Sequence, residues 1–228
     1  MQRWFLCLAL IPGWLGARAP LVRDDFSNGL TQWVVEQQPG GTVVAADGRL
    51  LITDAGGCTV WLREPLAAPV TITYTATVSS AGRVSDLNCF WMASDPARPD
   101  ALFAAGHHRD GRFAAYDSLR TYYVGYGGNT NTTTRFRRYD GSGARPLLPE
   151  HDLSAPEFLL KPDHAYQIAL VAGADGRVQF IRDGEILFDW IDPNPLRRGW
   201  FGFRTVNSRI EITDFSVHAG VSPSAAAR

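Results

Sequence analysis

The sequence lacks the features that mark several classes of protein. Its 228 residues include three cysteines, and no Cys-x-x-Cys pair or Cys/His spacing of a zinc site occurs. The formal net charge is -1, with 22 basic and 23 acidic residues, so the basic excess of a nucleic-acid-binding protein is missing. No internal repeat, coiled-coil pattern or helix of ordinary globular length is indicated. A zinc protein, a nucleic-acid-binding protein and a helical bundle are therefore disfavoured.

A short hydrophobic run lies near the start of the sequence. Arg3 gives it a positive beginning, Trp4–Leu15 forms the apolar part, and Ala17-Arg18-Ala19 fits the small-x-small pattern of signal-peptide cleavage. The run is too short to span a bilayer comfortably. We expect a signal peptide over residues 1–19 and a periplasmic or extracellular protein, with no membrane span after cleavage.

Two cysteines remain after the expected cleavage, Cys58 and Cys89, and both fall in strand-like segments. An exported chain meets an oxidising compartment, which would favour a Cys58–Cys89 disulfide. Buried cysteines also serve as small hydrophobic side chains. Both interpretations stay open, because the sequence does not give the Cα separation that a disulfide needs.

Turn-forming and aromatic residues are abundant, with 22 Gly, 14 Pro, 7 Trp, 7 Tyr and 12 Phe. Period-2 alternation between turn signals predicts a series of strands, thirteen segments in all. The predicted strands are Leu30–Glu36, Thr42–Ala45, Arg49–Thr53, Thr59–Leu62, Val70–Ser79, Asp86–Ala93, Arg120–Gly125, Thr132–Asp140, Tyr166–Ala172, Arg177–Arg182, Glu185–Trp190, Trp200–Val206 and Arg209–His218. Between them, Pro96–Arg120 is weakly patterned and reads as a long connection with a short helical turn.

Strands joined by short turns bury their apolar faces by packing as two sheets. We therefore predict an all-β fold, a two-sheet β-sandwich of the jelly-roll type. One domain is expected over residues 20–218. The small polar residues 219–228 are expected to form a disordered tail.

The segment Tyr122–Tyr139 concentrates tyrosine, asparagine and arginine around a Gly-Gly-Asn turn. Its two runs are expected to pair as strands, and alternate residues of a strand share a face. Aromatic rings, amides and guanidinium groups together suit an acidic sugar, because Arg binds a carboxylate in bidentate fashion. The alternative is that tyrosines favour strands and arginines cover a solvated face. We expect one concave surface to carry Tyr122, Tyr126, Arg135, Arg137 and Tyr139, with Asn129 and Asn131 at the turn.

Weaker candidates lie outside this segment. His107-His108 could supply a general base or a metal ligand, and His151 between two acidic residues is a similar but weaker case. Trp91 could stack on a sugar ring, although a strand tryptophan in a sandwich is more often part of the core.

The candidate cluster has tyrosine and arginine but no pair of carboxylates, which favours β-elimination of an acidic polysaccharide. Arginine and asparagine would neutralise a uronate carboxylate, a tyrosine or His108 would abstract the C5 proton, and a tyrosine would protonate the leaving oxygen. The alternative is a non-catalytic glycan-binding module that uses the same side chains. The assigned catalytic residues are Tyr122, Tyr126, His108, Arg135 and Arg137, and the assigned binding residues are Asn129, Asn131, Tyr139 and Trp91.

A family resemblance covers residues 24–218. The runs Gly176-Arg-Val-Gln-Phe-Ile-Arg-Asp-Gly184, Gly199-Trp-Phe-Gly-Phe-Arg204 and Ile212-Thr-Asp-Phe215 resemble the closing strands of the concanavalin A-like lectin/glucanase superfamily. The run Tyr122–Asp140 is similar to that of a narrower bacterial exported family, a domain of unknown function. The superfamily fold hosts lectins, glycoside hydrolases, lyases and interaction modules, so the resemblance implies the fold more strongly than the function.

The resemblance carries further expectations. The Glu-x-Asp-x-x-Glu signature of retaining glucanases of this fold is absent, which argues against a two-carboxylate hydrolase, while a keto-glycoside-cleaving hydrolase of similar fold remains an alternative. Some members hold a structural calcium, for which Asp24, Asp25 and Asp214 are candidates, and ordinary turn residues are the other interpretation. We expect no cofactor otherwise, and a polysaccharide or oligosaccharide partner.

Overall fold

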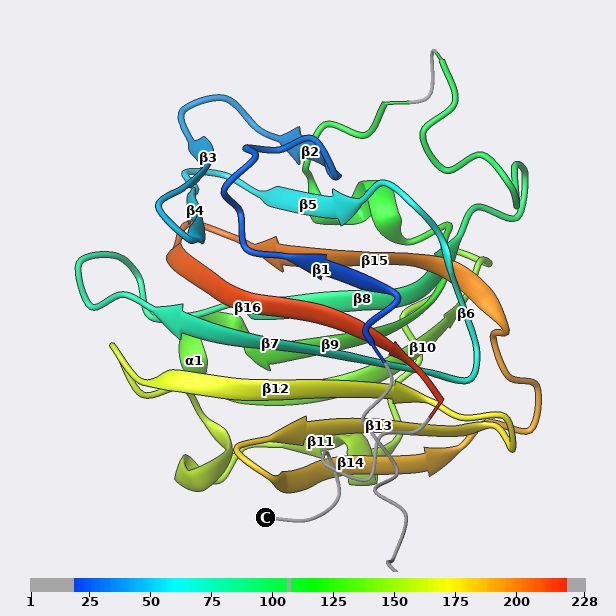
Figure 1. Cartoon of the computed structure of the whole chain (residues 1–228). Helices are drawn as coiled ribbons and strands as arrows, with labels where there is room; N and C mark the ends of the chain where they lie inside the picture. The colour runs from blue at the N-terminus through cyan, green and yellow to red at the C-terminus, as the bar shows by residue number, and fades with distance from the viewer. Residues whose placement is uncertain (1–18, 106–107, 221–228) are drawn as a thin grey trace, which may run out of the picture.

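Two antiparallel sheets of eight strands each stack to form the molecule (Figure 1). The computed structural model describes residues 19–105 and 108–220. The predicted all-β sandwich is confirmed. Most of the expected signal peptide and of the expected tail, residues 1–18 and 221–228, lies outside the described residues. In the described part, no helix is long and apolar enough to cross a membrane.

The first sheet, called the β7 sheet, has seven strands in a path and one attached strand. β1 pairs with β16 beside this path. In spatial order the strands are β14 (Glu185–Ile191), β13 (Arg177–Arg182), β12 (Ala165–Ala172), β7 (Val70–Val78), β16 (Arg209–Ala219), β4 (Arg49–Thr53) and β3 (Thr42–Ala46), with β1 (Val22–Asp24) off the path.

The second sheet, called the β8 sheet, is built in the same way. β6 pairs with β15 beside its path. In spatial order the strands are β11 (Asp152–Leu153), β10 (Thr133–Asp140), β9 (Arg120–Gly127), β8 (Leu87–Ser94), β15 (Arg198–Thr205), β5 (Cys58–Leu62) and β2 (Trp33–Gln37), with β6 (Leu66–Ala67) off the path.

Helical structure is limited to four short turns in the described residues. Three are 3₁₀ turns, Phe113–Tyr116, Pro149–His151 and Pro156–Phe158. The fourth, α1 (Gly128–Asn131), joins β9 to β10, and its residues Asn129 and Thr130 have left-handed φ angles of 52° and 62°. Asparagine tolerates this conformation better than most residues.

The main core lies between the two sheets. Along β7, the side chains of Val70, Ile72, Tyr74, Ala76 and Val78 are buried, as the alternation predicted. The β8 sheet contributes a facing set from every second residue of its strands. Burial of each large apolar side chain stabilises the fold by roughly 1.5–3 kcal/mol.

A second, aromatic core covers the opposite face of the β8 sheet, the one that points away from the β7 sheet. The long connection between β8 and β9 folds over this outer face, and its Leu102, Tyr116 and Leu119 are buried there. Trp61 and Phe90 of the sheet stack beneath it with ring centroids 5.4 Å apart. The predicted helical turn in this connection is confirmed at Phe113–Tyr116.

The two cysteines are free thiols in the main core. Cys58 lies on β5 and Cys89 on β8, and β15 runs between these two strands. They therefore act as small hydrophobic side chains, and the disulfide interpretation is wrong for this structure.

Candidate functional site

A row of polar side chains crosses the outer face of the β8 sheet, at one level of seven strands. Residues directly opposite in neighbouring strands share a face, so the register identifies the members. We call this set the polar row: Asp152, Arg135, Asn88, Arg204, Thr59 and Glu36, with Gly125 at the place between Arg135 and Asn88.

Both ends of the polar row are neutralised by ion pairs. Arg135 binds Asp152 in bidentate fashion, with Nε and Nη2 at 2.7 and 3.0 Å from the carboxylate oxygens. At the other end, Glu36 is only 1% exposed and forms an ion pair with Arg109 Nη2 at 3.1 Å. It accepts hydrogen bonds from Arg109 Nε at 3.2 Å and from the Trp61 indole at 2.8 Å. The charges at the two ends are therefore already paired within the protein.

The middle of the row holds two buried groups with spare hydrogen-bonding capacity. Asn88 donates from Nδ2 to Asp86 Oδ1 at 3.3 Å, while its Oδ1 has no partner among the described residues. Arg204 donates from Nη1 to Thr59 Oγ1 and Gly111 O, while its Nε has no partner in the same part of the chain. Unpaired buried polar atoms cost roughly 1–3 kcal/mol each, so these two mark a place where a further hydrogen-bonding group would be stabilised.

Tyr123 lies next to these groups, because its side chain leans along β9 over Gly125. A Cβ atom at Gly125 would lie 3.1 Å from the Tyr123 hydroxyl oxygen, so only glycine leaves room for this arrangement. The ring packs on Phe90 and Phe113, with centroids 4.9 and 5.4 Å away. Burial raises the pKa of Tyr123 well above 10, and the Arg204 guanidinium opposes this shift. The hydroxyl therefore stays protonated and can donate.

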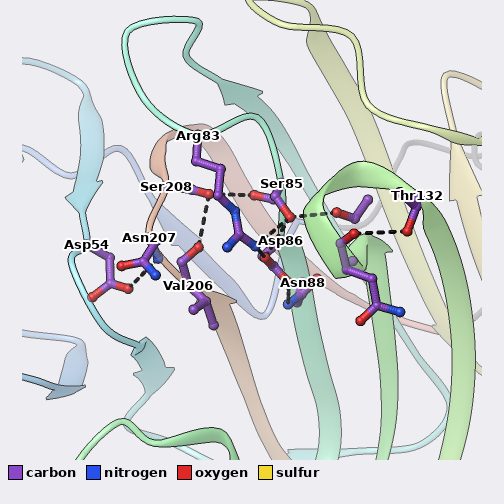
Figure 2. A network of polar contacts seen from close by, with 12 residues as sticks. Asp54, Arg83, Ser85, Asp86, Asn88, Thr132, Val206, Asn207 and Ser208 are labelled. Atoms are coloured by element: carbon purple, nitrogen blue, oxygen red, sulfur yellow. Dashed lines mark hydrogen bonds and ion pairs between the residues drawn. The ribbon is translucent and has the colours of Figure 1, made fainter.

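A network of polar contacts between loops surrounds Asp86, the hydrogen-bond partner of Asn88 (Figure 2). Arg83 pairs with Asp86, and Ser85 donates to Asp86 Oδ2 at 2.7 Å. Asp86 adopts a left-handed φ of 58°, and the serine and arginine contacts hold it there. Ser208 ties the β15–β16 turn to this loop by donating to Ser85 O at 2.7 Å. The Asp86 carboxylate that orients Asn88 is thereby fixed.

The prediction that Tyr122 and Tyr126 share a face with the arginines is wrong. In the hairpin, Arg135 pairs with Gly125 and Arg137 with Tyr123, so odd-numbered residues lie opposite odd-numbered ones. The side chains of Tyr122 and Tyr126 point into the main core and are fully buried. Burial raises the pKa of both hydroxyls. Neither can contact a ligand on the outer face, so the catalytic roles assigned to them are withdrawn.

Trp91 is also a core residue, packed between the sheets with its ring centroid 5.5 Å from that of Tyr122. The stacking interpretation of Trp91 is wrong, and the core interpretation is right. Its position on β8 follows the alternation in which Cys89 faces inward and Phe90 outward.

Arg135, Arg137 and Tyr139 do share the outer face, as expected. Arg137 is exposed to solvent on one side and donates to the carbonyl oxygens of Arg145 and Pro146. Tyr139 is 1% exposed and its hydroxyl has no partner in the described residues. Burial raises the pKa of Tyr139 to about 12. These three residues form the β10 border of the site around Tyr123.

The turn asparagines have structural contacts rather than a place on this face. Asn131 exchanges two hydrogen bonds with the backbone of Leu160, at 2.9 and 2.8 Å. Asn129 is exposed and contacts Thr133 Oγ1 at 3.4 Å.

The histidine candidates lie apart from this face. His108 is exposed, and its neighbour His107 lies outside the described residues. His151 is buried at the edge of the sandwich.

Asn88, Tyr123 and Arg204 were therefore missed as site residues. The sequence holds one sign of this arrangement: Gly125, two residues after Tyr123, has no side chain on the face that Tyr123 occupies. That Arg135 and Arg137 lie on the same face follows from the hairpin register, which the sequence does not give.

The acidic calcium candidates have other partners. Asp24 accepts hydrogen bonds from the Phe26 backbone and the Trp33 indole, at 2.7 and 2.8 Å. Asp25 binds Ser27. No group of three or more His, Cys, Asp or Glu side chains that could hold a metal ion is found among residues 19–105 and 108–220.

The comparisons with known proteins agree with the fold. The family model described as "Domain of unknown function (DUF6250)" matches residues 52–215. A protein of unknown function with a galectin-like fold from Bacillus subtilis is 21% identical, with 89% of this chain and 96% of that chain covered and a TM-score of 0.68. No curated protein matches the sequence.

Two further solved structures have the same architecture at lower identity. The carbohydrate-binding module CBM66 from Bacillus subtilis is 13% identical, covering 83% of this chain and 96% of that chain, with a TM-score of 0.57. A prokaryotic β-1,3-1,4-glucanase (lichenase) derived from a mouse hindgut metagenome is 13% identical, covering 88% and 99%, with a TM-score of 0.54. At these identities the likeness shows the fold, a concanavalin A-like jelly roll.

Proposed function

Given that this chain belongs to the DUF6250 family of domains of unknown function, we propose that it binds a glycan on the outer face of the β8 sheet. The observation that carries the proposal is the pair of unpaired buried atoms, Asn88 Oδ1 and Arg204 Nε, beside the Tyr123 hydroxyl. Together they offer an acceptor, a charged donor and a hydroxyl within one small area. Sugar hydroxyls both donate and accept hydrogen bonds, so they match this combination.

The surroundings support a sugar over other ligands. Gly125 leaves room for the Tyr123 hydroxyl in the polar row, and Arg135 and Arg137 stand at its β10 border. Because Arg135 is already bound to Asp152, the site does not depend on an acidic group in the ligand. The similar structures include a carbohydrate-binding module and a glucanase, which favours the same ligand class.

Glycan cleavage by β-elimination is the second candidate, and the position of Tyr123 favours it. A protonated tyrosine next to a guanidinium group can donate to the leaving oxygen of a glycosidic bond. The raised pKa of Tyr123 suits this acid role and opposes a role as the base in the unliganded protein. Since no base is assigned on this face, binding is the better supported function.

We further propose that the protein works in the periplasm or outside the cell. The support is the sequence pattern of Arg3, the apolar run Trp4–Leu15 and the small residues Ala17 and Ala19. N-terminal sequencing of secreted material should start at Pro20. Recovery of intact Met1 in a membrane fraction would contradict export.

The test of the glycan proposal is a binding screen of the purified protein on neutral and uronic-acid polysaccharides, followed by affinity measurement on the best ligand. Tyr123→Phe and Asn88→Ala each remove one hydrogen-bonding group, so each should weaken binding by about tenfold, the equivalent of ~1.4 kcal/mol. Tyr126→Phe is the matched control, because the same hydroxyl is removed from the core. Its affinity should equal that of the parent.

The outcomes separate the candidates. If Tyr123→Phe and Asn88→Ala both bind with the affinity of the parent, the ligand does not bind on this face. If no polysaccharide binds, the proposed glycan-binding function is refuted. Appearance of an unsaturated, ultraviolet-absorbing product from a uronate polymer would favour elimination, and its rate should then fall by about 10²-fold or more in Tyr123→Phe.

A further inference from the structure

A cavity of about 240 Å³ opens at the edge of the sandwich, next to the Asp152 end of the polar row. At this edge β10 of one sheet comes close to β14 of the other, and the segment Pro146–His151 covers the opening. Phe136 from β10 and Trp190 from β14 contact each other edge-on in its wall, with ring centroids 6.0 Å apart. The lining is Phe136, Arg137, Arg138, Asp140, Pro146, Leu148, His151 and Trp190.

The inner wall of the cavity is aromatic. His151 is 6% exposed, and its imidazole packs edge-on against Phe136, Phe188 and Trp190, with centroids 4.9, 5.9 and 6.1 Å away. No hydrogen bond to its ring nitrogens is found in the described part of the chain. Burial lowers the pKa of His151, so the ring is neutral at pH 7 and carries one donor and one acceptor.

The charges around the cavity are balanced by the protein itself. Arg138 donates from Nε to the buried Asp192 at 3.1 Å and from Nη2 to Asn194 O at 2.9 Å. Arg137 donates to two backbone carbonyl groups, and Asp140 places a carboxylate at the opening. A ligand carboxylate would find Arg138 already bound to Asp192, and the Asp140 carboxylate would repel it. An uncharged ligand avoids both problems.

The size of the cavity limits the ligand to a single ring. An apolar cavity of about 150 Å³ is large enough to bind benzene in another protein. A cavity of about 240 Å³ therefore has room for one six-membered ring with one or two small substituents. A glycan of several sugars would extend beyond it, and the mostly apolar walls leave few partners for sugar hydroxyls.

We propose that this cavity binds one small uncharged aromatic ring that carries a hydroxyl group, a ligand of the phenol class. The ring packs against the aromatic wall formed by Phe136 and Trp190, and the hydroxyl hydrogen-bonds to the His151 imidazole. Arg137 borders both this cavity and the proposed glycan site, but Phe136, His151 and Trp190, which hold the ligand here, take no part in the glycan site.

The experiment titrates the full chain with 4-methylphenol and follows binding by protein-observed NMR or calorimetry. Leu148 is 42% exposed at the opening, so Leu148→Trp should fill the entrance without disturbing the core and weaken binding by at least about tenfold, or ~1.4 kcal/mol. Val44→Trp is the matched control. Val44 is 50% exposed on β3, at the far end of the β7 sheet, and this variant should bind like the parent.

A second variant tests the hydroxyl contact. His151→Phe keeps an aromatic ring and removes both nitrogens, so 4-methylphenol should bind about tenfold more weakly while toluene binds as it does to the parent. The proposal is overturned if the parent fails to bind 4-methylphenol up to its solubility limit, or if Leu148→Trp binds it unchanged. It is also overturned if 4-methylbenzoate binds more tightly, or if a methyl glycoside displaces the phenol.

Discussion

Tyr122→Phe should destabilise the protein strongly, although it removes only one oxygen atom. The Tyr122 hydroxyl donates to Asp192 Oδ2 at 2.7 Å and accepts from the Leu196 backbone N–H at 2.9 Å; Tyr122 and Asp192 are buried and Leu196 is half-buried. A hydrogen bond to a charged group contributes roughly 1.5–3 kcal/mol, and an orphaned buried donor adds a cost of roughly 1–3 kcal/mol. Because Asp192 retains Arg138 as a partner, we expect a net loss of about 3 kcal/mol.

For a domain of this size, each kcal/mol lowers the Tm by about 2–4 °C, so Tyr122→Phe should lower it by about 6–12 °C. Thermal unfolding followed by circular dichroism measures the shift. Tyr123→Phe is the comparison, because its hydroxyl lies over Gly125 and lacks the carboxylate and backbone partners of Tyr122, so its removal should change stability by less than about 0.5 kcal/mol. Equal Tm values for Tyr122→Phe and the parent would refute the view of Tyr122 as a structural tyrosine.

Three further substitutions or conditions test other parts of the structure. Glu36→Ala leaves the Arg109 charge without its partner and should lower the free energy of unfolding, measured in urea, by about 3–5 kcal/mol. A loss below about 1 kcal/mol would show that the buried ion pair is not needed for stability. Gly202→Ala places a Cβ 2.6 Å from the ring of the fully buried Trp61 and should cost about 1–3 kcal/mol; unchanged stability would show that Trp61 can shift. Burial raises the pKa of Cys89 to about 12, so the folded thiol should resist Ellman's reagent at pH 8 and react only after unfolding. Because the pKa of Cys89 is higher in the folded than in the unfolded protein, the urea midpoint of unfolding should fall as the pH rises from 9.0 toward about 12. Rapid labelling of Cys89 in the native protein would contradict its burial.

The strand positions could be predicted from the sequence because alternation and turn residues are local signals. Arg49–Thr53 and Arg177–Arg182 agree with the predicted bounds, and Val70–Val78 differs by one residue at its end. The strands β1, β6 and β11 were not predicted. Each has only two or three residues, too few for a periodic pattern to appear.

The site could not be predicted as well, because it depends on which residues lie opposite each other across a turn. The left-handed turn at Asn129–Asn131 sets the β9–β10 register so that Tyr123, rather than Tyr122, shares a face with Arg137. A shift of one residue exchanges the two faces of a strand, and the five-residue connection between β9 and β10 has no standard hairpin sequence that would reveal this choice. Asn88 and Arg204 come from strands more than a hundred residues apart in sequence, and only the sheet order brings them together.

The last two described strands occupy central positions in the two sheets. β15 lies between β8 and β5, and β16 lies between β7 and β4 (Figure 1). Neither sheet is continuous until these strands are in place, so a growing chain has no complete sheet to fold until nearly all of it has been synthesised. Pairings over such long sequence separations fold slowly. The protein should therefore remain unfolded long enough to depend on chaperones, and removal of β16 should abolish the fold rather than shorten one edge.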